Sequence, residues 1–146
     1  MRTTRQLVVV VLLLLGSAQA TLYQDCGSDA EIQELVVQDC DIPPCVIHRP
    51  SSQDLNITFI PAHPANKLDT IINANIGGEN FPWPGPSGCP LLVDESCPIE
   101  PGHSYKYHAV MPVYAEYPAL SVIVTWKVQD ENGINHVCLV FPIVLV

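Results

Sequence analysis

Six cysteines constrain this 146-residue chain more than any other feature of its sequence. An even number of cysteines in a secreted chain implies three disulfides, and the count alone allows fifteen pairings. Two short separations, from the second cysteine to the third and from the fourth to the fifth, favour local bridges, which leaves the first and last cysteines to join the ends of the domain. Zinc binding is the competing use, but the sequence contains no C-x-x-C pair. The cysteines are Cys26, Cys40, Cys45, Cys89, Cys97 and Cys138.

The first twenty residues have the pattern of a secretory leader. Arg2 and Arg5 form a basic start, residues 7–15 are an unbroken aliphatic run, and 18–20 place small residues where a signal peptidase reads the chain. We therefore expect a signal peptide at 1–20, cleaved after Ala20, and one domain at 21–146. The aliphatic run is too short for a membrane span and no second run follows, so we expect the mature chain to be secreted and soluble.

The charge of the mature chain excludes one class of partner. Four basic residues remain after cleavage, against fifteen acidic ones, which gives a net charge of −11. Phosphate binding requires clustered lysine and arginine, so nucleic acid is not an expected partner. The same charge opposes electrostatic docking on anionic lipid at neutral pH.

Short segments of alternating hydrophobic and polar residues recur along the domain and predict strands. The clearest is 120–128, where Val122, Val124 and Trp126 are expected to face inward. Residues 130–133 have the pattern of a hairpin turn. Segment 137–146 is apolar on both faces and is expected to be a covered strand. With hardly a helical segment among them, these strands indicate an all-β antiparallel β-sandwich. The expected strands are 31–37, 46–47, 55–59, 70–76, 105–113, 120–128 and 137–146.

One glycosylation sequon, Asn56-Ile57-Thr58, lies in the expected strand 55–59. The alternation there places Asn56 on the exposed face, where a glycan can fit. Secretion, exposure and the sequon together predict a glycan on Asn56.

The stretch from Phe81 to Cys89 contains three prolines, two glycines and two large aromatic residues. Proline donates no ladder hydrogen bond, so this stretch cannot be a helix or a central strand. We expect a stiffened loop that holds Phe81 and Trp83 against an apolar surface. That loop either covers the end of the core or forms a wall or lid of a ligand pocket.

No catalytic constellation stands out in the sequence. The five histidines are scattered without the spacing of a metalloprotease, and there is neither a phosphate-binding glycine loop nor a nucleophile elbow. The carboxylates are interpreted as a solvated face. We therefore predict that the protein is not an enzyme and has no metal or cofactor.

Taken in order, the motifs resemble the ML lipid-recognition domain family, and within it the Niemann–Pick type C-two (epididymal secretory protein) group. The resemblance covers essentially the whole mature chain, and the ordered set of motifs is far more specific than any one of them. The motifs are Asp25-Cys26-Gly27-Ser28, Cys40-x4-Cys45, Asn56-x-Thr58-Phe59, Phe81-Pro82 to Gly88-Cys89, Cys97-Pro98-Ile99, Tyr105-x-Tyr107, Pro112-Val113, Glu116-Tyr117-Pro118, Trp126-x3-Asp130 and Cys138.

The resemblance implies an immunoglobulin-like sandwich with an apolar cavity between its sheets. It implies the pairs Cys26–Cys138, Cys40–Cys45 and Cys89–Cys97, and the binding and transfer of one sterol molecule without catalysis. By correspondence with the family, Phe81, Val113 and Tyr117 would line the ligand tunnel. We add Trp83, Pro118 and Trp126 as ligand-binding residues, because they flank these positions or back the pocket.

The resemblance leaves the ligand class and the partner open. The alternatives are an extracellular carrier of fatty acids or semiochemicals and an innate-immune module that recognises microbial lipid. A solid-core adhesion domain and a small hydrolase are the more distant alternatives. The protein is expected to be a monomer, secreted or lysosomal, and the lipid would pass to a membrane sterol-transfer protein or a lipid receptor.

Overall fold

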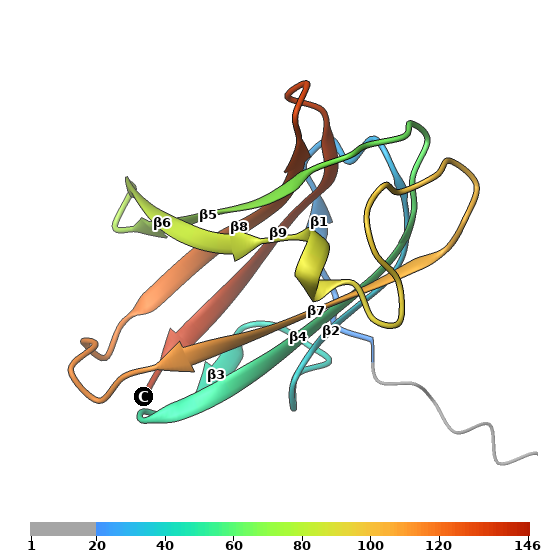
Figure 1. Cartoon of the computed structure of the whole chain (residues 1–146). Helices are drawn as coiled ribbons and strands as arrows, with labels where there is room; N and C mark the ends of the chain where they lie inside the picture. Colours follow the sequence, from blue (N-terminus) through green and yellow to red (C-terminus); the bar gives the residue numbers. More distant parts are fainter. Residues whose placement is uncertain (1–19) are drawn as a thin grey trace, which may run out of the picture.

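The computed structural model describes residues 20–146 (Figure 1), so the expected signal peptide, apart from its last residue, lies outside the described part of the chain. Two β-sheets face each other, and the predicted all-β sandwich is confirmed. Within residues 20–146 the helical structure is one 3-10 turn, η1 (Cys89–Leu91). The larger sheet has the order β1 (Gln24–Asp25), β9 (Asn135–Leu145), β8 (Ser121–Asp130), β5 (Leu68–Ile76) and β6 (Glu79–Ser87). Strand β3 (Cys45–Ile47) also pairs with β9. The smaller sheet has the order β2 (Glu31–Val37), β4 (Ser51–Ile60) and β7 (Tyr105–Val113).

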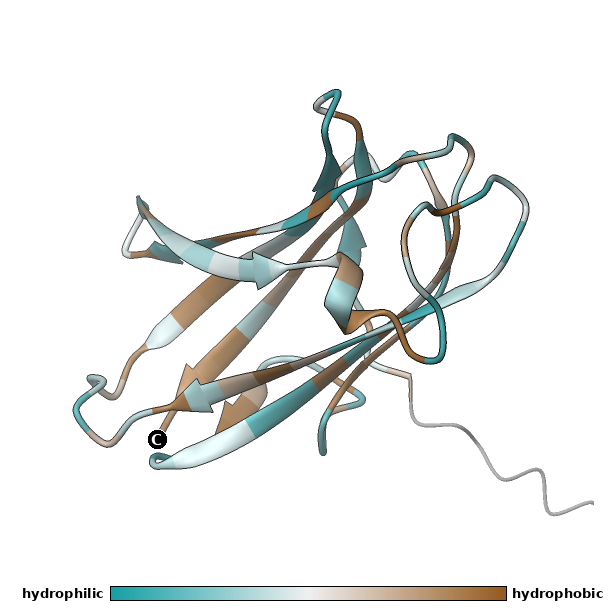
Figure 2. Ribbon diagram, in the orientation of Figure 1, coloured by the Kyte–Doolittle hydropathy of each residue, from teal (hydrophilic) through white to brown (hydrophobic). Residues whose placement is uncertain are grey.

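The strands form where hydrophobic residues alternate with polar ones, because alternate side chains of a strand point to opposite faces of its sheet. In β8, Val122, Val124, Trp126 and Val128 are buried, whereas the residues between them are exposed or half-buried. Pairing is antiparallel throughout, except that the short β3 runs parallel to β9. Figure 2 shows hydrophobic residues concentrated along β8 and β9, at the centre of the larger sheet.

Strand β9 is an interior strand and not an edge, as its sequence predicts, and its first part is covered on both faces. It pairs with β8 along one edge, and with β1 and β3 along the other. Four consecutive residues at its start, 136–139, are buried. Consecutive apolar residues at 137–139 are therefore tolerated here, because neither face of this segment meets solvent.

The stretch from Phe81 to Cys89 is not the loop that we expected. Residues 79–87 form the edge strand β6, which, among the strands of residues 20–146, pairs only with β5. Pro82 and Pro84, two residues apart, lie opposite Asn73 and Ile71. Alternate residues of an antiparallel strand turn their main-chain groups toward the partner. Prolines at this spacing can thus face the free edge of the sheet, where no N–H donor is needed.

Gly85 sets how closely β6 approaches β5. It lies next to the point where the register of the two strands shifts. A Cβ atom at this position would lie 2.4 Å from the main-chain oxygen of Thr70, nearer than such atoms approach. Only glycine fits here, so β6 can approach β5 this closely at the shift in register.

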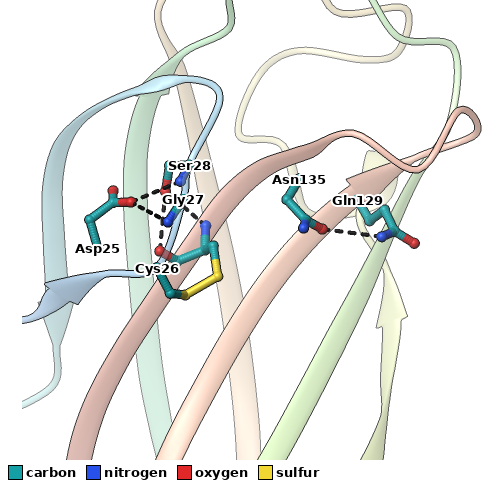
Figure 3. The surroundings of a disulfide bond; sticks show 7 residues. Asp25, Cys26, Gly27, Ser28, Gln129 and Asn135 are labelled. Carbon is teal, nitrogen blue, oxygen red and sulfur yellow. Dashed lines mark hydrogen bonds between the residues drawn. A yellow bond between two sulfur atoms is a disulfide. The ribbon is translucent and has the colours of Figure 1, made fainter.

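Three disulfides close the fold: Cys26–Cys138, Cys40–Cys45 and Cys89–Cys97. These are the pairs that the family resemblance implied. Beside the first of them, the Asp25 carboxylate accepts hydrogen bonds of 2.8 Å from the main-chain N–H groups of Gly27 and Ser28 (Figure 3). The Ser28 hydroxyl in turn accepts a 2.8 Å hydrogen bond from the main-chain N–H of Cys138. The N-terminal segment is thus fixed to the middle of β9.

A buried carboxylate organises the hairpin between β8 and β9. One oxygen of Asp130 accepts hydrogen bonds from the main-chain N–H groups of Asn132 and Ile134, at 2.8 and 3.0 Å. The other oxygen lies 2.8 Å from Nε2 of His136, and both side chains are fully buried. The turn predicted at 130–133 is therefore present, and a buried polar pair holds its two strands together.

Candidate functional site

An apolar cavity lies between the two sheets. About 200 Å³ is open to the centres of water-sized molecules, whereas one buried water needs roughly 10–15 Å³ of such space. The larger sheet lines the cavity through Ile72, Ala74 and Ile76 of β5 and Val122, Val124 and Trp126 of β8. Further walls come from Phe141, Ile143 and Leu145 of β9 and from Leu55, Met111 and Val113 of the smaller sheet.

The period of the strands explains why one cavity collects so many apolar side chains. Residues 72, 74 and 76 share one face of β5, and residues 122, 124 and 126 share one face of β8. These two strands are neighbours, with Ala74 opposite Val124 and Ile72 opposite Trp126. The cavity therefore sits on a continuous hydrophobic face, and polar atoms contribute almost nothing to its surface.

Trp126 belongs to the deeply buried part of the cavity wall and is 2% exposed. Its ring meets that of Tyr107 from the smaller sheet edge to face, at a centroid distance of 6.4 Å. The Tyr107 hydroxyl lies 2.6 Å from the Thr70 hydroxyl. Burial raises the pKa of Tyr107, against the effect of that hydrogen bond, so the phenol stays neutral beneath the cavity.

The mouth of the cavity lies where lining residues reach the surface. Trp83 of β6, Pro112 of β7 and Pro118 of the β7–β8 loop line the cavity and are exposed. Tyr117 of the same loop lies across from Trp83, with the rings 5.3 Å apart and nearly perpendicular. An edge strand and a connecting loop thus meet across the opening.

Tyr117 is the polar group at this opening. Burial raises the pKa of its phenol, and neighbouring Tyr114 and the Glu116 carboxylate raise it further. Tyr117 therefore stays protonated at physiological pH and keeps an O–H that can donate a hydrogen bond. Tyr114, at 5.4 Å from Tyr117, extends the aromatic rim outward.

The structure brings together five of the six residues predicted to bind ligand. Trp83, Val113, Tyr117, Pro118 and Trp126 all line the cavity. Phe81 does not line it: its side chain is 47% exposed, and it lies opposite Ala74, nearer the end of the hairpin. Phe81 shares a face of β6 with Trp83, but it is not among the residues that line the cavity.

Sequence reasoning missed most of the aliphatic lining. Ile76, Leu120, Ile143 and Leu145 line the cavity, although no motif singles them out. The available signal was the strand period, which places Ile143 and Leu145 on one face of β9. That period cannot separate cavity-lining residues from solid core.

The described residues offer no metal centre. Within 20–146 there is no group of three or more histidine, cysteine or acidic side chains placed to hold a metal ion. Three exposed histidines each face a single carboxylate, in the pairs His63–Asp29, His103–Glu95 and His108–Asp54. Among residues 20–146 no helix has the length and hydrophobicity needed to cross a membrane.

The fold and the site define a small β-sandwich with an internal apolar pocket, the type of domain that holds a hydrophobic ligand. The sequence profile of the family described as ML domain matches residues 20–145. The chain belongs to the ML domain family, whose members related to it are lipid-binding transport proteins and not enzymes.

Named relatives and solved structures agree with this assignment. NPC intracellular cholesterol transporter 2 of Danio rerio is 31% identical over 147 residues, covering 97% of each chain. The crystal structure of a Niemann–Pick type C2 protein from the Japanese carpenter ant has a TM-score of 0.75 at 22% identity, covering 86% of this chain and 99% of the other. Chicken MD-1 complexed with lipid IVa has a TM-score of 0.54 at 15% identity, with 82% and 85% covered.

Proposed function

We propose that this protein is a non-enzymatic carrier that holds one sterol-like lipid between its sheets and passes it on unchanged. The observation that carries the proposal is the apolar cavity, which is walled by both sheets and reaches the surface at Trp83 and Pro118. The naming of the zebrafish relative as a cholesterol transporter supports a sterol, and the lipid IVa bound to the fold neighbour MD-1 supports a lipid ligand more broadly.

The energetics of such a carrier follow from its lining. An apolar ligand gains about 25 cal/mol for each Å² of surface removed from water. A cavity that exists before binding avoids most of the loss of conformational entropy that ordering a pocket would bring. Because the interior lacks polar partners, the polar group of the ligand would stay at the mouth, where the Tyr117 hydroxyl can bond to it.

We assign the ligand contacts to Trp83, Val113, Tyr117, Pro118 and Trp126. Trp126 belongs to the deeply buried part of the wall, and Tyr117 and Trp83 form the opening. Phe81 is left out of the binding set, because its side chain lies outside the cavity.

We also propose that the mature chain is secreted and glycosylated. Asn56 lies in the middle of β4 with an exposed side chain, on the outer face of the smaller sheet and away from the cavity. A glycan there would not obstruct the mouth. Removal of N-glycans from the secreted protein should lower its mass, and Asn56→Gln should abolish that change.

A carrier of fatty acids is the second candidate function. The modest size of the cavity favours it, because a flexible acyl chain can fill a narrow space that a rigid ring system enters only if the sheets or the mouth widen. The mechanism of binding would be the same for both ligand classes.

Native mass spectrometry of the secreted protein, followed by extraction of bound molecules, tests the proposal. The stripped protein is then titrated with dehydroergosterol, a fluorescent sterol, and with cis-parinaric acid, a fluorescent fatty acid. We expect one sterol per chain and saturable uptake of dehydroergosterol. Uptake of the fatty acid alone would select the second candidate. A protein that carries nothing and takes up neither probe would disprove the carrier function.

A further inference from the structure

Arg49 connects three segments that are far apart in the sequence. It lies half-buried between β3 and β4. Its Nη1 donates a hydrogen bond to the main-chain oxygen of Tyr117. Its Nε and its main-chain N–H both donate to the main-chain oxygen of Val146, at 3.3 and 3.0 Å. One side chain thus ties the β7–β8 loop to the end of β9.

The Tyr117 loop has few other fixed points. The main-chain N–H of Tyr117 donates a 3.2 Å hydrogen bond to the main-chain oxygen of Tyr114, within the same loop. Within the described part of the chain, two hydrogen bonds join loop residues 114–120 to other segments: the main-chain N–H of Leu145 donates to the main-chain oxygen of Leu120 at the base of the loop, at 2.9 Å, and the Arg49 side chain donates at Tyr117. Arg49 is thus the contact that holds the part of the loop nearest the mouth. The phenol of Tyr117 lines the cavity and meets Trp83 across the mouth. The position of Tyr117 at the mouth therefore depends on Arg49.

We propose that Arg49 is a positioning residue for ligand exchange, and that its hydrogen bond to Tyr117 is a latch that sets how often the mouth opens. The inference rests on the carrier function proposed above. A guanidinium suits this role, because its planar fork holds two acceptors at once and it stays charged at every physiological pH. A lysine at this position would have one ammonium group and could not reproduce the fork.

The latch has a specific kinetic signature. Arg49 does not line the cavity, so its side chain has no direct contact there that would favour the ligand-bound state. A bond that closes the mouth equally in the empty and the filled protein slows binding and release by the same factor, and leaves the equilibrium affinity unchanged. Loss of the latch should therefore accelerate both steps.

The test compares Arg49→Met and Arg49→Lys with the wild-type protein and with Lys127→Met as a control. Lys127→Met removes the same charge from the outer face of β8, on the side of the sheet opposite the cavity. Binding of dehydroergosterol is followed by stopped-flow energy transfer from tryptophan, and release by a chase with excess unlabelled cholesterol. If the wild type takes up only cis-parinaric acid, that probe and an unlabelled fatty acid are used instead. Thermal unfolding of each variant is recorded in parallel.

We expect Arg49→Met to raise both rate constants about tenfold, the scale of one lost hydrogen bond to a charged group, with Kd changed by less than about twofold. Arg49→Lys should give an intermediate increase, and it also serves if Arg49→Met does not fold. Unchanged rates in a folded variant, or faster release with unchanged binding, would overturn the latch. A wild type that binds neither probe would instead disprove the carrier function.

Discussion

The Trp83 indole and the Tyr117 phenol meet edge to face across the mouth of the cavity, 5.3 Å apart at an angle of 87°. Trp83 belongs to the free edge of the larger sheet, whereas Tyr117 belongs to the loop that joins the two sheets. Their contact is thus the point where the two walls of the opening touch. In the proposed carrier, ligand exchange would require this pair to separate, so we test the site here.

Trp83→Ala should accelerate release of bound ligand. An edge-to-face aromatic pair contributes about 0.5–1.5 kcal/mol, so we expect release to be about two- to tenfold faster. Because Trp83 is 37% exposed, the thermal midpoint should change little. The measurement is the release rate of a fluorescent sterol from each protein.

Phe81→Ala is the matched comparison for that variant. Phe81 lies two residues away on the same strand and is similarly exposed, but it lies outside the cavity. Its truncation should change release much less than that of Trp83. An equal effect of the two substitutions would contradict the assignment of Trp83, rather than Phe81, to the mouth.

Ala74→Phe should block the cavity without unfolding the protein. Ala74 lies on the cavity face of β5, opposite Val124 of β8. A benzyl side chain there enters space that is otherwise empty, so the free energy of unfolding should stay within about 1 kcal/mol of the wild type. Ligand affinity should fall at least about tenfold, because the ring and the ligand compete for one volume.

Ile123→Phe provides the control for bulk alone. Ile123 is exposed on the outer face of the same strand that carries Val124, so the added ring points away from the cavity. Sterol titration of both variants should show normal affinity for Ile123→Phe. Retained affinity in Ala74→Phe would place the ligand somewhere other than between the sheets.

The sequence predicted the faces of the strands better than their ends or their neighbours. The residues of 120–128 that were expected to face inward are the buried ones of β8, whereas β4 runs from 51 to 60 rather than from 55 to 59. The edge strand β6 was mistaken for a loop. Prolines two residues apart are compatible with a loop and with an edge strand. The sequence does not show which strand lies at the edge, because that depends on the pairing of β6 with β5.

In the site, too, the sequence predicts which face of a strand a residue lies on, but not which distant segment it contacts. Trp83 and Phe81 share one face of β6, so a period of two cannot tell which of them lies at the mouth. The contact of Trp83 with Tyr117 decides it, and that contact depends on how the two sheets pack. The Arg49 hydrogen bond was equally hidden, because it joins residues 68 positions apart.

The three disulfides should differ in their contributions to stability. Cys26–Cys138 closes a span of 112 residues, and Cys40–Cys45 a span of 5. In the chain-entropy view, replacing both cysteines by alanine should lower the free energy of unfolding by about 4.8 kcal/mol for the first pair and about 2 kcal/mol for the second. Urea unfolding of the two double variants measures this. Equal losses would show that native contacts, rather than the unfolded chain, determine the effect.

Asp130 should make the stability of the fold depend on pH. Burial alone would raise the pKa of this carboxyl, but hydrogen bonds from His136 and from the main-chain N–H groups of Ile134 and Asn132 outweigh it and hold the pKa below its usual range. A carboxyl whose pKa is lowered in the folded state stabilises the fold above its unfolded pKa, near 4. That contribution is lost as the pH falls through the folded-state pKa.

Asp130→Asn should therefore destabilise the protein at neutral pH and matter less in acid. The asparagine amide has one acceptor oxygen where the carboxylate has two. A buried donor is therefore left unpaired, which lowers the free energy of unfolding by about 1–3 kcal/mol. Asp69→Asn is the control, because its pair with Lys67, at 3.6 Å, is exposed and should contribute less than about 1 kcal/mol. Denaturant unfolding between pH 3 and pH 8 should show the deficit of Asp130→Asn shrinking below about pH 4. A deficit that stays constant across this range would show that packing, and not the charge of Asp130, holds the β8–β9 hairpin.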